Sequence, residues 1–306
     1  MKVLRGFRSE GRLRVGAMGC QVCGEQRIET SRLIRYGGVV AVAAGDNEPV
    51  NLRQRRRFNE LWAGCRSTAL SPDRIRFGVW RPYLVPPVVE VGAGDGLLAR
   101  TFTALQIVSV DQAVAGLRNA PMPKSLGIAE RLPLRDRYAR TIVMAEVLEH
   151  TSDPVEALTE CRRIAAPNAR LLLSVPTFPL AIPESVYHWA RIRQRPTLSN
   201  LKLWDPEHER RYSVEELLAQ LNQSGWHVLE VVPLFGTATT CLLYFGEVFV
   251  ERLLRRRIPL AHFGAPLDYL WRKFDRHSGV AVICGPCPAS PCLGLSRRYG
   301  QVGVSR

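Results

Sequence analysis

Three glycines that alternate with other residues lie at positions 92, 94 and 96, directly after the apolar run 88–91. Glycine has no Cβ, so such a turn can adopt positive φ and let a ligand approach its backbone N–H groups. Acidic Glu90 precedes the turn, and no Lys-Ser/Thr pair follows it. A polyphosphate would need the lysine of a P-loop, whereas a carboxylate beside a glycine turn suits a nucleotide-like ligand that carries positive charge.

The spacing of the glycines separates this turn from a dinucleotide-binding turn. A dinucleotide fingerprint has its third glycine three residues after the second, whereas Gly96 follows Gly94 by two and position 97 is Leu. The pattern therefore favours S-adenosylmethionine, with its sulfonium and ammonium groups, over NAD. An NAD-dependent oxidoreductase stays as the less favoured enzyme alternative.

A second apolar run, 107–110, ends in Asp111, nineteen residues after Gly92. An acidic residue at this place binds the ribose hydroxyls in nucleotide-binding βαβ units. With these motifs the chain resembles the class I S-adenosylmethionine-dependent methyltransferases, whose first motif is an acidic residue followed by Gly-x-Gly-x-Gly. The segments 127–134 and 141–154 follow in an order similar to the bacterial small-molecule branch of that family, so the resemblance spans about residues 85–284.

The resemblance implies a cofactor site built by the glycine turn and the loops after the neighbouring strands. The expected cofactor-binding residues are Glu90, Gly92, Gly94, Asp95, Gly96, Asp111, Ile128, Ala129, Glu130 and Glu146. Relatives usually place Asp where Ile128 stands, to accept a hydrogen bond from the adenine amine. Ile cannot accept it, so we expect the adenine to pack on Ile128 and to use the backbone of Ala129 and the carboxylate of Glu130. Losing a charge-assisted bond costs about 1.5–3 kcal/mol.

Two further departures from the family pattern bear on activity. Ala139-Arg140 stands where an aromatic-Asp pair is usual, and Asn168-Ala169 stands where a Gly-Gly turn is common. Asn tolerates the left-handed conformation, so we expect the turn at Asn168 to persist. These departures keep open the alternative of a non-catalytic binding protein on a methyltransferase fold.

Acceptor chemistry needs alignment more than acid or base groups, because methyl transfer is an in-line displacement. His150 is the candidate general base for an oxygen acceptor, and the alternative is that Glu149 and His150 only organise their loop. His208 is the preferred acceptor contact within the aromatic-rich insertion 177–212. Other candidates there are Tyr187, His188, Trp189, Trp204 and Arg211.

Metal binding and redox chemistry are also suggested by single motifs. Glu146, Glu149 and His150 are similar to a set that some ubiquinone-biosynthesis O-methyltransferases use for a divalent cation, but many relatives with these residues use none. The cysteine pairs at 20/23 and 284/287 are too far apart in sequence for an ordinary zinc ribbon. The Cys-Gly-Pro-Cys motif at 284–287 follows a strand rather than opening a helix, so we expect reduced thiols and no metal.

Strands that alternate with amphipathic helices predict an α/β fold. We expect a doubly wound, mostly parallel, seven-stranded, Rossmann-like sheet with a helical N-terminal extension. The later strands are predicted at 171–176, 227–232 and 279–284. One helix is predicted from Pro154, capped by Ser152 or Asp153, to Pro167-Asn168, and another over 214–223 with a capping box at Ser213 and a C-cap at Gly225.

The predicted domain organisation follows from these elements. Residues 1–80 form an extension, partly disordered, with a helix over 52–65 that caps the cofactor site; residues 81–285 form the methyltransferase domain, and 286–306 form a tail. Segment 177–212 is an insertion on the acceptor side, and 236–275 is an amphipathic insertion.

The net charge is +14, but only four of the 42 basic residues are Lys. An arginine bias of this kind reflects composition, so we expect no specific nucleic-acid partner. The apolar run 241–254 is broken by Glu247 and Glu251 and followed by Arg255, Arg256 and Arg257. It predicts an amphipathic helix in 241–257 that packs on the sheet or lies on an anionic membrane.

The sequence as a whole predicts a cytoplasmic S-adenosylmethionine-dependent methyltransferase, since no secretory signal is apparent. Its acceptor is expected to be a small molecule or a lipid-linked molecule, with the methyl group transferred to oxygen. A position at the membrane surface would suit a lipid, quinone or glycolipid acceptor.

Overall fold

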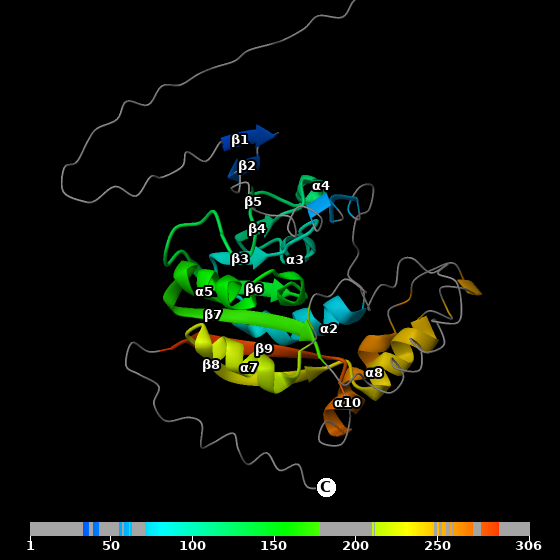
Figure 1. Cartoon of the computed structure of the whole chain (residues 1–306). Helices are drawn as coiled ribbons and strands as arrows, with labels where there is room; N and C mark the ends of the chain where they lie inside the picture. The colour runs from blue at the N-terminus through cyan, green and yellow to red at the C-terminus, as the bar shows by residue number, and fades with distance from the viewer. Residues whose placement is uncertain are drawn as a thin grey trace, which may run out of the picture. The chain divides into compact units, whose positions relative to one another are not determined.

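The computed structural model describes residues 33–36, 39–42, 55–56, 58–60, 62, 71–177, 210, 212–247, 250, 253–254, 258, 260–271 and 277–287. Its nine-stranded sheet has the order β1-β2-β5-β4-β3-β6-β7-β9-β8 (Figure 1). The strands are β1 (Leu33–Tyr36), β2 (Val39–Val42), β3 (Val88–Val91), β4 (Ile107–Asp111), β5 (Lys124–Leu126), β6 (Ala139–Ala145), β7 (Ala165–Pro176), β8 (Trp226–Leu234) and β9 (Gly279–Pro286).

The sheet is mostly parallel, as predicted, and has nine strands where the sequence predicts seven. β2, β5, β4, β3, β6 and β7 pair in parallel, whereas β9 runs antiparallel to both of its neighbours, β7 and β8. β1 and β2 form an antiparallel pair that extends the sheet beyond β5. The N-terminal extension therefore contributes strands as well as helix, which the weak periodicity of its sequence did not predict.

Helices connect the strands as right-handed crossovers require. They are α2 (Ser71–Trp80), η1 (Arg81–Tyr83), α3 (Leu97–Thr101), α4 (Val114–Asn119), η2 (Leu148–His150), α5 (Pro154–Ile164), α7 (Val214–Gln223), α8 (Thr237–Cys241), η3 (Leu242–Glu247), η4 (Ala261–Phe263) and α10 (Ala265–Trp271). Residues 55–56, 58–60 and 62 are also helical.

The central strands bury both faces, as strands of a parallel sheet do. Alternate residues point to opposite sides, so Val88 joins the cluster that contains Phe77 and Trp80 of α2, whereas Val89 joins the cluster under α5 and α7. Leu171 and Leu173 of β7 share the second cluster, and Leu172 between them belongs to the first. This alternation explains why β7 reads as a continuous apolar run in the sequence.

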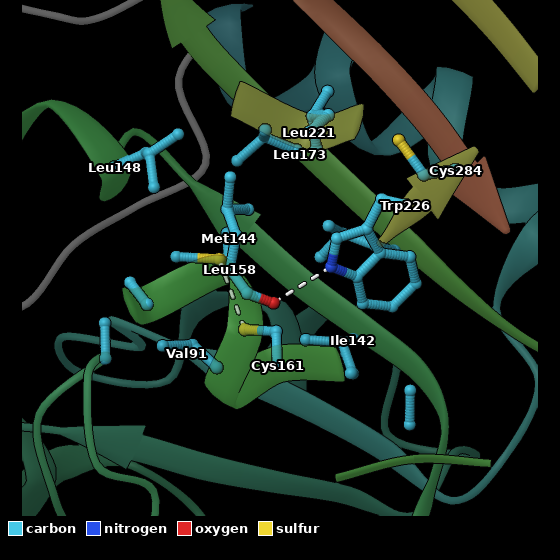
Figure 2. Close-up of a cluster of buried hydrophobic side chains, with 14 of the residues drawn as sticks. Val91, Ile142, Met144, Leu148, Leu158, Cys161, Leu173, Leu221, Trp226 and Cys284 are labelled. Atoms are coloured by element: carbon cyan, nitrogen blue, oxygen red, sulfur yellow. Dashed lines mark hydrogen bonds between the residues drawn. The ribbon is translucent and has the colours of Figure 1, made fainter. Parts of the chain in front are cut away.

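The cluster under α5 and α7 is anchored by Trp226. Figure 2 shows its indole near Leu221, Met144 and Ile142, with the ring N–H directed at the backbone oxygen of Leu158 within α5. The indole Nε1 donates a hydrogen bond of 2.9 Å to the carbonyl oxygen of Leu158, and Trp226 is fully buried. This bond satisfies the single polar group of a large side chain in the core.

α5 begins as predicted but ends earlier. Asp153 is its N-cap, because its carboxylate accepts hydrogen bonds from the backbone N–H groups of Val155 and Glu156, and Pro154 occupies the first turn. The helix ends at Ile164, and the chain passes directly into β7, so the predicted end at Pro167-Asn168 is wrong. Asn168 lies in extended backbone without positive φ, so the expected left-handed turn does not form.

α7 agrees with its sequence signals at both ends. Ser213 and Glu216 form the reciprocal capping box at the N-terminus, and Gly225 adopts φ +77° just after Ser224, the last cap residue. β8 follows directly, and it is longer than the predicted strand by one residue at its start and two at its end. β9 likewise continues to Pro286, so Cys284 lies inside a strand.

The insertion after β8 is helical but not one regular helix. α8 passes into η3, which is a π-helix, and Leu243 and Tyr244 of η3 are buried with Ala261. Across the described residues of this insertion, the large apolar side chains left exposed are Phe245, Leu253, Leu254, Ile258, Phe263, Leu267 and Leu270. Within the part of the chain that the structure covers, no helix is both long and apolar enough to span a membrane.

Candidate active site

The glycine turn between β3 and α3 has the backbone that the sequence predicts. Gly92 and Gly94 adopt φ values of +72° and +54°, in the region that L side chains rarely enter. A Cβ on Gly92 would collide with Val147, and one on Gly94 would lie 2.5 Å from the ring of Trp62. Both positions therefore require glycine, and both residues line a cavity at the carboxyl ends of the strands.

Asp111, the last residue of β4, holds this turn from below. Its Oδ2 accepts a hydrogen bond of 2.7 Å from Gly94 N, and its Oδ1 accepts one of 2.7 Å from Ala113 N. Burial raises the pKa of Asp111, and these two hydrogen bonds act in the opposite direction. A carboxylate has about four acceptor positions, so Asp111 can bind ribose hydroxyls while it orders the turn.

Glu90 and Asp95 lie beneath the turn rather than on the cavity wall. Burial, together with the charges of Asp111 and Asp95, raises the pKa of Glu90 to about 8. Its Oε2 has no hydrogen-bond partner among the described residues. Asp95 is fully buried and pairs with Arg100 at 2.9 Å. This arrangement leaves one unsatisfied acidic oxygen directly under the turn.

The loop after β5 forms a second wall of the cavity. Gly127, Ile128, Ala129 and Glu130 all line it. Glu130 Oε1 accepts a hydrogen bond of 2.8 Å from Ser152 N, which ties this loop to the start of α5. This wall is therefore apolar at Ile128 and acidic at Glu130, whose carboxylate already accepts a hydrogen bond from Ser152 N.

Glu146, directly after β6, also lines the cavity and has an unusual backbone conformation. Its φ is +54°, which for a non-glycine residue indicates a position over-determined by its surroundings. Ser174 Oγ donates a hydrogen bond of 2.9 Å to Glu146 Oε1, and Arg76 Nη2 lies 3.3 Å from the same oxygen. Arg76 of α2 is itself buried, so the Glu146 carboxylate is held from two sides.

Two aromatic side chains from the helical segment before α2 border the cavity. Phe58 and Trp62 line it, and the Phe58 ring meets the His150 ring edge-on with the centroids 5.5 Å apart. Asn59 Oδ1 accepts a hydrogen bond of 2.9 Å from Ala115 N at the start of α4. Trp62 lies against Gly94, and the cavity volume is about 200 Å³. This is narrower than typical ligand pockets of roughly 300–1,000 Å³.

The cavity brings together most of the predicted cofactor residues. Those on its wall are Gly92, Gly94, Asp111, Ile128, Ala129, Glu130 and Glu146, and the candidate base His150 also lines it. Glu90, Asp95 and Gly96 lie outside the wall. Phe58, Trp62, Gln112 and Val147 were not singled out, although the spacing of Phe58 and Trp62, four residues apart in the predicted helix 52–65, placed both rings on one helix face.

A comparison with protein families supplies the identity. The model of a methyltransferase domain family matches residues 55–231, which is more than half of the chain. The chain belongs to this family. It is a class I S-adenosylmethionine-dependent methyltransferase, and its cofactor is S-adenosylmethionine.

Solved methyltransferase structures resemble this methyltransferase at low identity. One from Thermotoga maritima, described as a possible histamine N-methyltransferase, is 16% identical over 77% of this chain and 96% of that chain, with a TM-score of 0.47. A phosphoethanolamine N-methyltransferase from Haemonchus contortus is 14% identical over 76% and 57%, with a TM-score of 0.48. One from Archaeoglobus fulgidus is 16% identical over 69% and 92%, with a TM-score of 0.46. No curated protein matches the chain significantly.

The cavity of this methyltransferase fits its cofactor in two respects. The glycine turn presents backbone without Cβ atoms to the cavity, and a Cβ on Gly94 would collide with the ring of Trp62. The acidic side chains of Asp111, Glu130 and Glu146 on the cavity wall suit the cationic groups of S-adenosylmethionine.

Several predicted acceptor and metal positions lie outside the described residues of the methyltransferase. These are His208, Tyr187, His188, Trp189, Trp204, Arg211, Cys20, Cys23 and Cys292. Arg210, just before Arg211, donates hydrogen bonds to the carbonyl oxygens of Thr151 and Ser152. Where the structure describes the chain, no three His, Cys, Asp or Glu side chains are grouped to hold a metal ion. Burial raises the pKa of the Cys284 thiol, which makes it unreactive.

Proposed function

We propose that this methyltransferase transfers a methyl group to an oxygen of a small-molecule or lipid-linked acceptor by direct in-line displacement. The observation that carries this proposal is the position of His150 on the wall of the cavity that Gly92, Gly94 and Asp111 also line. An imidazole titrates near neutral pH and can accept a proton from an acceptor hydroxyl. A purely structural His150 would not need to face the cavity.

The cofactor is proposed to lie along the glycine turn. Gly92 and Gly94 would let the cofactor lie against their backbone because neither has a Cβ, Asp111 would accept hydrogen bonds from the ribose, and Ile128, Ala129 and Glu130 would contact the adenine. Glu90, Asp95 and Gly96 would support the turn from below. When bound, S-adenosylmethionine supplies an activated methyl group on its sulfonium.

The chain's own groups would then align and deprotonate the acceptor. Phe58 and Trp62 cover the cavity and would exclude water from the reacting atoms. His150, held against Phe58, would take the hydroxyl proton as the acceptor oxygen attacks. Glu146, fixed by Ser174 and Arg76, would orient the acceptor by accepting a hydrogen bond. His208 is proposed as a further acceptor contact.

Peripheral contact with a membrane through 241–257 is proposed as the way to a lipid-linked acceptor. Phe245, Leu253 and Leu254 are exposed by 49%, 68% and 53%, and the sequence places three arginines directly after them. Apolar side chains next to cationic ones suit an anionic lipid surface. Sedimentation with anionic but not zwitterionic vesicles, weakened by salt, would support this contact, and no sedimentation would contradict it.

Titration with S-adenosylhomocysteine by calorimetry tests the cofactor site. We expect micromolar binding that Gly94→Ala and Asp111→Ala abolish, because one substitution fills the turn and the other removes its anchor. Gly78→Ala is the matched control: no atom lies within 4 Å of a Cβ built on this exposed helical glycine, so binding should be unchanged. No binding to the unsubstituted chain would favour the non-catalytic alternative, and preferential binding of NAD would favour the oxidoreductase.

A further inference from the structure

A second cavity lies between α2, the edge strand β8 and the helical insertion. Its volume is about 380 Å³, larger than that of the cavity beside the glycine turn. Ile75 and Val79 of α2, Val232 and Leu234 of β8, and Ala265 of α10 form apolar walls. Glu230, Asp268 and His277 also line the cavity, so it suits a molecule that is mostly hydrocarbon and carries a polar group.

One polar group in this cavity has no partner. Thr239 of α8 is 1% exposed, and its Oγ1 makes no hydrogen bond to any described residue. The neighbouring carboxylate of Asp268 is already used, since it accepts hydrogen bonds from Ala238 N and Thr239 N. Buried hydroxyl groups are nearly always hydrogen-bonded. We therefore expect an oxygen of a molecule bound in the cavity to form a hydrogen bond with the Thr239 hydroxyl.

A row of three side chains lies between this cavity and the cofactor-side cavity. Phe235 lines the second cavity, and its ring centroid lies 5.8 Å from the guanidinium carbon of Arg76. Arg76 in turn pairs with Glu146, which lines the first cavity. A molecule that passed this row would have its apolar part beside α2 and its polar end near Glu146.

The outer side of the second cavity is apolar as well. Ala265 and Asp268 of α10 face the cavity, whereas Leu267 and Leu270, on other sides of the helix, are exposed by 51% and 73%. A hydrocarbon chain can therefore contact apolar side chains at the surface of the insertion before it enters the cavity.

We propose that the second cavity binds the hydrocarbon part of the methyl acceptor, with Thr239 hydrogen-bonded to an oxygen on that part. The acceptor is then an amphipathic molecule whose hydrocarbon chain carries a hydroxyl, ester or ether oxygen. This inference rests on the proposed function for the position of the reacting head group, but binding of the chain itself can be measured separately.

Linear primary alcohols from 1-hexanol to 1-decanol are suitable probes, because each has a hydrocarbon chain and one oxygen. Calorimetric titration of the full chain is expected to show one saturable site. The affinity should rise about fourfold per added methylene until the cavity is filled, and should then level off. Absence of saturable binding in a preparation that binds S-adenosylhomocysteine would overturn the proposal.

Variants locate the bound alcohol. Ala265→Phe, which fills the cavity, should abolish 1-octanol binding, and Thr239→Val, which removes the hydroxyl but keeps the shape, should weaken it about tenfold. Leu270→Ala on the outside of α10 is the control and should leave it unchanged. Unaltered 1-octanol binding by Thr239→Val would overturn the proposal, and this variant decides the question if Ala265→Phe fails to fold.

S-adenosylhomocysteine titration of the same preparations separates the two proposals. The variants should bind it as the unsubstituted chain does, because their side chains lie outside the glycine-turn cavity. If alcohols bind as expected but S-adenosylhomocysteine does not bind, the assignment of the second cavity is supported. The same result would contradict the proposed methyl transfer.

Discussion

Glu90 makes the stability of the folded chain depend on pH. Its pKa is raised from 4.5 to about 8, chiefly by burial, so the folded state holds the proton more tightly than the unfolded state does. The stabilisation is complete below about pH 4.5 and is lost as the pH rises through about 8. We therefore expect the free energy of unfolding to fall between these values, by at most about 1.4 kcal/mol per pH unit from this group.

Urea unfolding of Glu90→Gln between pH 5 and 8.5 isolates this contribution, because the amide is neutral throughout. The variant should lose the downward slope and should be more stable than the unsubstituted chain at pH 8.5. Glu156→Gln, at an exposed position in α5, is the control and should keep the slope. A slope that persists in Glu90→Gln would assign it to other groups.

Residue types and their spacing predicted residues that the structure brings to one cavity, because they lie at or after the ends of neighbouring strands and the carboxyl ends of parallel strands share one edge. Gly94 and Asp111, seventeen positions apart, are joined by a hydrogen bond of 2.7 Å as this geometry requires. Side-chain partners from elsewhere in the chain were not predictable. Nothing in the sequence connects Arg76 with Glu146, because their contact depends on how α2 packs against the sheet.

Phe58 and Trp62 line the cavity, and among the described residues of their helical segment Asn59 makes a side-chain hydrogen bond to α4. Ala113, the N-cap residue of α4, provides no side-chain hydrogen bond, and Asn59 Oδ1 instead accepts from Ala115 N at 2.9 Å. Removing this acceptor in Asn59→Ala should cost about 1 kcal/mol, as the loss of a helix cap does. A loosened cover should also let S-adenosylhomocysteine dissociate about three to ten times faster.

Stopped-flow dissociation and thermal unfolding of Asn59→Ala measure the two effects together. Glu60→Ala is the neighbouring control, since Glu60 is exposed. An unchanged dissociation rate with reduced stability would mean that Asn59 supports α4 without closing the cavity.

The helix starts that the sequence predicted best are set by capping residues within the helices' own first turns. The capping box at Ser213 and the cap at Asp153 fix where α7 and α5 begin, because the bonding groups lie within three positions of each other. The predicted end of α5 at Pro167-Asn168 is wrong because the chain pairs with β6 from Ala165 onward. Local helix propensity alone would extend the helix past this residue. The π-helical η3 likewise depends on packing of Leu243 and Tyr244 against Ala261.

At the scale of the whole chain, the helix before the glycine motif belongs to the same buried cluster as the sheet. Trp80 is fully buried and Phe77 is 7% exposed, together with Val88, Val143 and Leu172. The sequence placed a domain boundary after residue 80, because the periodicity before it is weak. The family match, in contrast, begins at residue 55.

Two truncated chains discriminate between these boundaries. A chain that begins at residue 51 lacks β1 and β2, which join the sheet only through the short pairing of β2 with β5, and keeps Phe58, Asn59 and Trp62. We expect it to fold and to bind S-adenosylhomocysteine within about twofold of the full chain.

A chain that begins at residue 81 loses Phe77, Trp80 and Arg76. Removing a buried Phe or Trp side chain costs about 3–5 kcal/mol each, and the total stability of a domain is only about 5–15 kcal/mol. Loss of Arg76 also leaves the Glu146 carboxylate without its cation. We therefore expect this chain to be largely unfolded by circular dichroism and unable to bind S-adenosylhomocysteine. A folded, binding-competent chain from residue 81 would show instead that α2 is an appendage and that the sheet is stable without it.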